Sequence, residues 1–121
     1  VFSFAQSSSF DLAIKNARII DGTGNPWFRG DLGIRDGRIA KIGIINAGEA
    51  KETIDAGNQI VAPGFIDVHG HTENIFNNPA AENFIRMGVT SIVTGNCGGS
   101  VTEVGKFLDR YRETPVAVNV G

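Results

Sequence analysis

The residues in this sequence that are best suited to chemistry are its two histidines and its single cysteine. His69 and His71 follow the apolar run 65–68, and Cys97 follows the apolar run 89–94. Side chains alternate along a strand, so the two imidazoles would share one face, and a neighbouring strand would bring the cysteine to the same end. Zinc binds imidazole nitrogen at about 2.0–2.1 Å and thiolate sulfur at about 2.3 Å. The spacing therefore predicts a metal site with His69, His71 and Cys97 as ligands.

Each of these residues also has a simpler interpretation. Histidines at the end of a strand are often only hydrogen-bonded, and a lone cysteine is often a buried apolar residue or a reactive thiol. Glu73 and Asn96 are candidates for positions beside the ligands or the substrate, although Glu73 is equally consistent with an ordinary loop carboxylate. Asp67 is expected to be structural. The residue types and their spacing leave these alternatives open.

A helix is predicted between the two apolar runs. Asn78 is a suitable N-cap and Pro79 suits the first helical position, so the helix should run to Met87 and stop at Gly88. Phe84 and Met87 are three residues apart and are expected on its inner face.

A second helix and a third strand are predicted after the cysteine. Ser100 and Glu103 have the spacing of a capping box, and the apolar run 116–120 reads as a strand. The inner face of this helix is expected to carry Val101, Val104, Leu108 and Tyr111. Strands alternating with helices indicate parallel βα units with right-handed crossovers.

The predicted parallel units favour a (β/α)8 barrel over an open doubly wound sheet. Barrel active sites lie at the C-terminal ends of the strands, where the candidate ligands are expected. Such a barrel typically needs about 250 residues, so this chain would hold only its first strands and helices.

The N-terminal half is predicted to be small antiparallel β-structure. Two turns are clear, one at 21–26 and one at Asp36-Gly37, the latter suited to the positive φ angles of a type I′ turn. A further strand pair is expected around the turn 55–58. The expected strands are 12–14 with 17–20, 32–34, 39–42, 53–54 and 59–61.

Composition excludes several classes of function. The chain has 121 residues, of which 41% are hydrophobic and 20% are charged, as in ordinary globular proteins. Its formal net charge is −2 and its basic residues are scattered, which argues against a nucleic-acid or anionic-lipid partner. No apolar run approaches the roughly 20 residues that span a bilayer, so no membrane span is predicted.

The first ten residues resemble the end of a secretory signal peptide. They are apolar and then serine-rich, and Ser3 and Ala5 would occupy the small-residue positions of a cleavage site, with Gln6 first in the mature protein. This predicts an exported protein, periplasmic or secreted. The alternative is a disordered N-terminal extension, with a cytoplasmic location.

Four segments carry a resemblance to a known family. Residues 11–24, 30–43 and 62–71 resemble the N-terminal part of the amidohydrolase superfamily. Residues 88–98 narrow this to the N-acyl-D-amino-acid deacylase, or D-aminoacylase, branch. The resemblance covers essentially the whole chain after its first ten residues.

The resemblance implies a fold and a ligand set. The family has a metal-dependent (β/α)8 barrel beside a small β-sandwich, so 11–62 would be part of the sandwich and 63–121 the start of the barrel. His69, His71 and Cys97 match metal ligands of the branch, in which one or two zinc ions are expected. The cysteine replaces the carboxylated lysine that bridges two metals in other branches. The catalytic aspartate comes from a later strand, so this chain alone is expected to be inactive.

The resemblance also implies a reaction. The expected activity is hydrolysis of an N-acyl-D-amino acid to a D-amino acid and a carboxylate by metal-activated water, with the remainder of the chain as an obligatory partner. The alternatives are a cyclic-amide hydrolase of the hydantoinase or dihydroorotase kind, which should lack the ligand cysteine, and a noncatalytic metal-binding remnant. Glu73 and Gly99 depart from the branch, which commonly has an aspartate and an aromatic there, and this weakens any transfer of substrate preference.

Overall fold

The structure is a computed structural model that describes residues 8–121, so the predicted cleavage-site residues Ser3, Ala5 and Gln6 lie outside the described residues. It is a mixed α and β structure with more strand than helix. The chain divides into two compact units, Val1–Pro63 and Gly64–Gly121. None of the helices within residues 8–121 is long and apolar enough to cross a membrane.

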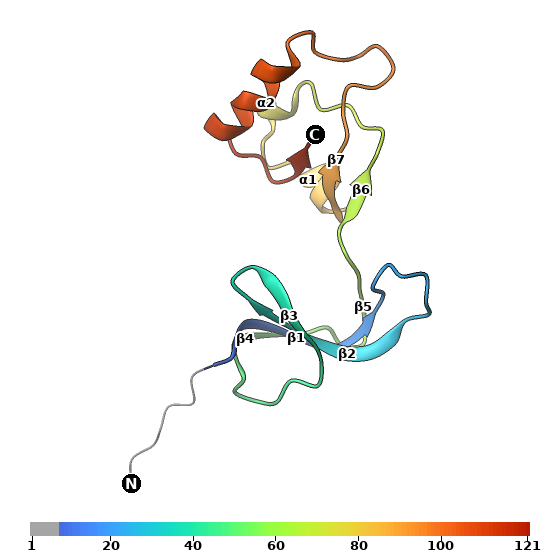
Figure 1. Ribbon diagram of the computed structural model, residues 1–121, viewed down its shortest axis with the longest axis vertical. Helices are drawn as coiled ribbons and strands as arrows, with labels where there is room; N and C mark the ends of the chain where they lie inside the picture. The colour runs from blue at the N-terminus through green and yellow to red at the C-terminus, as the bar shows by residue number, and fades with distance from the viewer. Residues whose placement is uncertain (1–7) are drawn as a thin grey trace. The chain divides into compact units, whose positions relative to one another are not determined.

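The first unit is a five-stranded sheet with β1 at its centre (Figure 1). The order along the sheet is β3-β2-β1-β4, and β5 also pairs with β1. The strands are β1 (Phe10–Ile19), β2 (Phe28–Arg35), β3 (Arg38–Gly43), β4 (Ala50–Asp55) and β5 (Ile60–Val61).

Both predicted hairpins are present. Strand β2 pairs antiparallel with β1 and with β3. Asp36 and Gly37 have φ angles of 52° and 70°, and positive φ at both central residues is what a type I′ turn requires. This turn lets the hairpin follow the right-handed twist of its strands.

The predicted pairing of β4 with β5 is wrong. Both strands run parallel to β1 and pair with successive parts of it, with Ile54 opposite Ile14 and Val61 opposite Ile19. The register of β1 shifts between Ile14 and Ala17. At this bulge the turn after β4 bonds to β1 instead of folding back, because Ala56 N–H donates to the Lys15 carbonyl at 2.8 Å. The sheet is therefore mixed, not antiparallel.

Asp11 links three parts of this sheet. Its carboxylate accepts hydrogen bonds from Lys51 Nζ at 2.6 Å and from the Asp36 backbone N–H at 2.8 Å. The bond from Lys51, followed by that from Asp36, lowers the pKa of Asp11 below its ordinary 3.8. A lowered carboxyl pKa stabilises the fold above the unfolded value, and this stabilisation is lost as the pH falls through the lowered pKa.

We expect Asp11→Asn to lower the melting temperature at pH 7, because the ion pair is lost. The difference from the wild type should shrink as the pH falls through the lowered pKa of Asp11. Glu52→Gln on β4 is the control, since Glu52 makes no ion pair within residues 8–121. Thermal unfolding followed by circular dichroism across the acid range measures both variants. A difference that stays constant with pH would contradict the assigned role.

The second unit is a three-stranded parallel sheet in the order β6-β7-β8 (Figure 1). This confirms the predicted parallel pairing, although the third strand is shorter than the predicted 116–120. The elements are β6 (Phe65–Asp67), η1 (Ile75–Asn77), α1 (Glu82–Ile85), β7 (Val89–Ile92), α2 (Val104–Glu113) and β8 (Asn119–Val120).

The first helix is shorter than predicted. Helix α1 has four residues and is preceded by Ala81 in the left-handed region. Asn78 is not its N-cap, because the Asn78 backbone N–H bonds to the Ile75 carbonyl and closes the 3-10 turn η1. Gly88 ends the segment as predicted, with a φ of 78° and its N–H bonded to Ile85. The Asn-Pro signal is therefore used by a turn.

The predicted capping box of the second helix does not form. Helix α2 begins at Val104, and its N-cap Glu103 makes no side-chain capping bond. The Glu103 carboxylate instead pairs with Lys106 at 3.3 Å, and Ser100 Oγ donates to the Val101 carbonyl. The local signal marks the right place in the chain but not the first residue of the helix.

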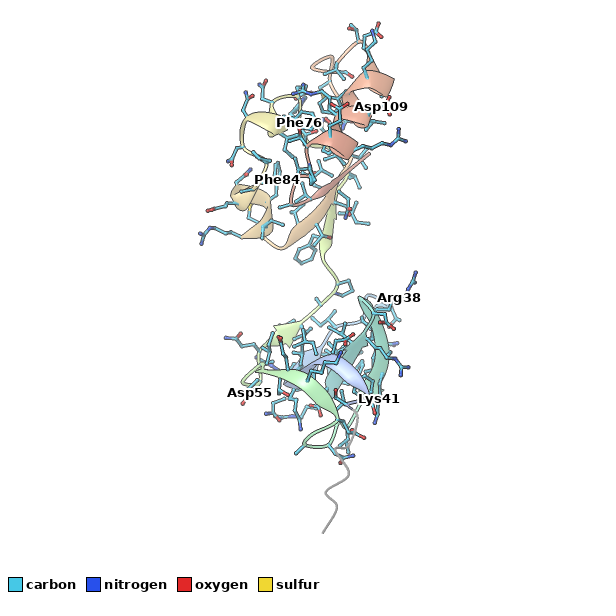
Figure 2. The ribbon with its side chains drawn as sticks, turned by 90° about the vertical axis from the view of Figure 1, so that its left-hand side faces the viewer. Arg38, Lys41, Asp55, Phe76, Phe84 and Asp109 are labelled. Atoms are coloured by element: carbon cyan, nitrogen blue, oxygen red, sulfur yellow. The ribbon has the colours of Figure 1, made fainter. Side chains whose placement is uncertain are left out.

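The buried helix faces also differ from those expected. Phe84 packs against the core as predicted, but Met87 is 62% exposed. On α2 the buried residue is Phe107, which lies edge-on to Phe76 of η1 at 5.5 Å between ring centroids. Figure 2 shows Phe76 beside α2. Tyr111 joins this aromatic cluster, whereas Val104 remains exposed.

Candidate metal centre

The segment with both histidines and the segment with the cysteine leave the same ends of neighbouring parallel strands. Backbone pairing continues past the strands, because Val93 N–H donates to the Asp67 carbonyl at 2.7 Å and Gly70 N–H donates to the Val93 carbonyl at 3.0 Å. The loop after β6 is therefore held along the loop after β7. This is the arrangement that the parallel pairing predicts.

The closest contact between these loops joins Cys97 to His69. Cys97 Sγ lies 3.0 Å from His69 Nε2, although 27 residues separate them in the sequence. Cys97 has a φ of 53°, and Gly95 and Gly98 beside it also have positive φ. A cysteine in the left-handed region is uncommon, and such strain occurs preferentially at functional sites. The loop therefore brings this sulfur to His69.

His71 contacts a carboxylate instead of the cysteine. Its Nδ1 lies 3.2 Å from Glu73 Oε1. The pKa of the Glu73 carboxyl is lowered by its own backbone N–H and then by His71. A carboxylate that accepts a hydrogen bond from Nδ1–H favours the tautomer in which Nε2 keeps its lone pair for a metal. Of the two interpretations of Glu73, the geometry favours the one in which it orients the imidazole.

The three predicted ligands do not form one cluster. The ring centroids of His69 and His71 are 6.2 Å apart, and no three His, Cys, Asp or Glu side chains within residues 8–121 are arranged to hold a metal ion. Asn96 donates from its amide to the Val93 carbonyl at 3.2 Å, so in this structure it supports the cysteine loop.

Neighbouring side chains hold the backbone of the histidine segment in place. Asp67 Oδ1 accepts the His69 N–H at 3.0 Å, which agrees with the structural role expected for Asp67. Thr94 Oγ1 accepts the Thr72 N–H at 3.3 Å. The sequence reasoning missed Thr94, and the only signal for it was a hydroxyl at the end of the strand that leads to Cys97.

Two glycines allow the loop after β6 to lie close to β7 and to the cysteine loop. A side chain at Gly99 would place its Cβ 3.1 Å from both Nδ1 and Cε1 of His71. A Cβ at Gly70 would overlap Cγ2 of Ile92, a side chain that is only 1% exposed. The glycine between the histidines is therefore required by the packing of β7.

Thr72, next to His71, carries a buried hydroxyl. Thr72 is 2% exposed, and neither its Oγ1 nor Tyr111 Oη has a hydrogen-bond partner within residues 8–121. Burial raises the pKa of Tyr111, and the nearby Thr72 hydroxyl partly opposes this, although the two groups do not meet in hydrogen-bond geometry. An unpaired buried hydroxyl costs about 1–3 kcal/mol.

We expect Thr72→Val combined with Tyr111→Phe to raise the free energy of unfolding by about 1 kcal/mol or more, since two unpaired groups are removed. Urea denaturation measures this change. Thr102→Val at an exposed position is the control and should change stability by less than about 0.5 kcal/mol. A loss of stability in the double variant would show that the hydroxyls are paired in solution.

The donor set fits zinc. Thiolate and imidazole ligands at zinc bond lengths in a tetrahedron lie about 3.5 Å apart, so the Cys97–His69 pair at 3.0 Å needs to open only slightly. Nε2 of His71 is the nitrogen that its contact with Glu73 leaves available. His69, His71 and Cys97 are therefore chemically suited to hold the ion, although the loops must move to gather all three.

Known proteins share this sequence and this fold. The family model for the urease alpha-subunit, N-terminal domain, matches residues 2–68. N-acyl-D-glutamate deacylase of Alcaligenes xylosoxydans xylosoxydans is 51% identical over 89 residues, covering 73% of this chain and 18% of the relative. D-aminoacylase of the same organism is 36% identical over 141 residues, covering 97% and 29%. D-hydantoinase of Ralstonia pickettii is 44% identical over 95 residues, covering 78% and 19%.

A solved structure extends the comparison. N-acyl-D-glutamate deacylase from Bordetella bronchiseptica, complexed with zinc and a phosphonate inhibitor, superposes with a TM-score of 0.87 at 36% identity. The match covers 94% of this chain and 29% of that protein, so the chain spans less than a third of the length of its relatives. The chain belongs to the amidohydrolase superfamily, in the branch of the D-aminoacylases and N-acyl-D-glutamate deacylases.

Proposed function

We propose that this chain is part of a longer enzyme that hydrolyses the linear amide of N-acyl-D-amino acids. The observation that carries the proposal is the 3.0 Å contact between Cys97 Sγ and His69 Nε2, made by two loops at the same end of a parallel sheet. The proposal is also supported by the similarity of the chain to N-acyl-D-glutamate deacylase and D-aminoacylase. The solved N-acyl-D-glutamate deacylase holds zinc and a mimic of the tetrahedral intermediate.

Zinc is the proposed cofactor, held by His69, His71 and Cys97. When bound, zinc supplies Lewis acidity to the amide carbonyl and activates water for attack. The residues of this chain prepare the site. The left-handed conformation of Cys97 directs its sulfur toward His69, and Glu73 orients the imidazole of His71. The thiolate acts as a ligand and not as a nucleophile.

The proposal includes the organisation of the longer enzyme. Residues 11–62 would form part of a β-sandwich, and residues 63–121 would open a (β/α)8 barrel whose later strands provide the other ligands and the catalytic aspartate. The parallel order β6-β7-β8 supports this, as does the position of the ligands at the C-terminal strand ends. Export to the periplasm or the medium is proposed from the signal-like first ten residues.

Hydrolysis of a cyclic amide is the second candidate. The 44% identity to a D-hydantoinase over 95 residues favours it. Against it stands Cys97, whose sulfur lies 3.0 Å from His69 Nε2 and offers a thiolate ligand there, whereas the cyclic-amide branch is expected to use a bridging lysine from a later strand.

The test is a comparison of substrates with the zinc-loaded longer enzyme. We expect release of the D-amino acid from N-acetyl-D-glutamate and N-acetyl-D-methionine, with little turnover of hydantoin or dihydrouracil. Turnover of the cyclic substrates alone would select the second candidate. Zinc binding without turnover of either class would show a noncatalytic metal-binding protein.

A further inference from the structure

A cavity lies next to the proposed metal centre within the second unit. Its volume is about 260 Å³, and it is lined by the loops after β6 and β7, by helix α2 and by Gly121. Pockets that enclose a whole drug-sized ligand measure about 300–1,000 Å³, so this one suits a single arm of a molecule. Its lining includes Glu73, which contacts His71, and Gly95, which begins the cysteine loop. A group bound in the cavity would therefore be separated from His71, a proposed metal ligand, only by the side chain of Glu73.

The wall formed by α2 and by Val101 just before it is apolar. Val101, Val104 and Leu108 line the cavity, with the buried ring of Phe107 beside them. Val104 is 52% exposed and Leu108 is 38% exposed, although both are apolar and were expected on the inner face of the helix. An apolar ligand in the cavity would remove these side chains from water, which stabilises a complex by about 25 cal/mol per Å² of apolar area.

The rest of the lining is more polar, since it includes the hydroxyls of Thr94 and Ser100 and the carboxylate of Glu73. Glu73 is the only ionisable residue of the cavity lining, and its carboxylate would repel the carboxylate of an amino acid or an acidic side chain. In an N-acyl-D-glutamate, the amino acid named for the 51% identical relative, the side chain is itself a carboxylate, so only the acyl chain is both uncharged and aliphatic.

We propose that this cavity binds the aliphatic acyl chain of the substrate and sets the preferred acyl length. The inference rests on the proposed function and deepens it, because it assigns the acyl arm to α2 and leaves the amino-acid arm to other parts of the enzyme. Val104 and Leu108 are specificity-determining residues in this account, and they take no part in the chemical step.

The test is a series of acyl lengths on one amino acid, using the longer enzyme. N-acetyl-, N-butanoyl- and N-hexanoyl-D-glutamate are compared by kcat/KM in the wild type and in two variants. Val104→Phe fills the cavity, and Leu108→Glu adds a second carboxylate to its wall. The quantity compared is the ratio of kcat/KM for the hexanoyl substrate to kcat/KM for the acetyl substrate. In both variants we expect this ratio to fall about tenfold or more below its wild-type value. Asp109→Phe, on the next residue of α2 and outside the lining, is the matched control (Figure 2).

The outcomes separate the two proposals. A variant that still hydrolyses the acetyl substrate is folded. If Val104→Phe does not hydrolyse it, the acyl assignment is tested with Leu108→Glu, whose position is half-exposed. A hexanoyl-to-acetyl ratio that stays at the wild-type value in the folded cavity variants would overturn the acyl assignment alone. A wild-type enzyme that hydrolyses none of the three substrates and no N-acetyl-D-methionine would overturn the proposed function and the acyl assignment with it.

Discussion

Replacing Cys97 by serine should remove most of the zinc from the longer enzyme and lower kcat/KM by about 100-fold or more. Thiolate is a ligand that zinc prefers, whereas a serine hydroxyl stays protonated near neutral pH and is not among its usual ligands. Even the loss of a residue that only supports a ligand typically costs about 10- to 100-fold in metal affinity or activity. Zinc per protein after dialysis, measured by mass spectrometry of the metal, and steady-state kinetics give the two readouts.

A second variant distinguishes the sulfur from the loop conformation. Cys97 has a φ of 53°, and asparagine adopts this left-handed region more readily than most residues. Cys97→Asn should therefore keep the loop and still lose the zinc. If either variant keeps full zinc content and the wild-type rate, Cys97 has no role as a ligand, and the interpretation of it as a free thiol returns.

Substituting Gly70 by alanine should disturb the fold and the ligands together. The new Cβ would overlap Cγ2 of Ile92, which has no free space because it is buried in the core cluster with Ile75 and Val118. Overpacking of this kind costs about 1–3 kcal/mol. The histidine segment must move away from β7, so zinc affinity should fall in parallel with the free energy of unfolding. Urea denaturation and zinc titration measure the two effects.

A matched control and a second-site change test this explanation. Gly105 lies in α2 with no heavy atom within 4 Å of the position of an added Cβ, so Gly105→Ala should stabilise the helix by up to about 1 kcal/mol. Ile92→Ala removes the methyl group that meets the new Cβ. Gly70→Ala should therefore cost less in the Ile92→Ala background than alone, and equal costs in both backgrounds would contradict the packing argument.

The parts of the fold that were predictable from sequence are those with a local signal. Asp36-Gly37 specifies its own turn, and apolar runs separated by helical segments specify parallel strands. The pairing of β4 and β5 with β1 was not predictable, because it depends on a bulge in β1 and on a turn that bonds to it. The predictions of where the helices begin were wrong for a related reason. Asn78 has the features of an N-cap, but its N–H closes the preceding 3-10 turn.

The candidate site shows the same division. Topology alone was sufficient to place Cys97 near a histidine, since adjacent parallel strands end together. The role of Glu73 was left open, because a carboxylate two residues from His71 can point toward or away from the ring, and in the structure it contacts the ring. The supporting hydroxyl of Thr94 had no motif that could reveal it.

Zinc K-edge X-ray absorption of the longer enzyme tests the metal centre most directly. In the wild type we expect one sulfur at about 2.3 Å together with nitrogen or oxygen ligands at about 2.0–2.2 Å, and in Cys97→Ser the sulfur contribution should disappear. A wild-type spectrum that contains only nitrogen and oxygen ligands would contradict the assignment of Cys97 and the metal centre built on it.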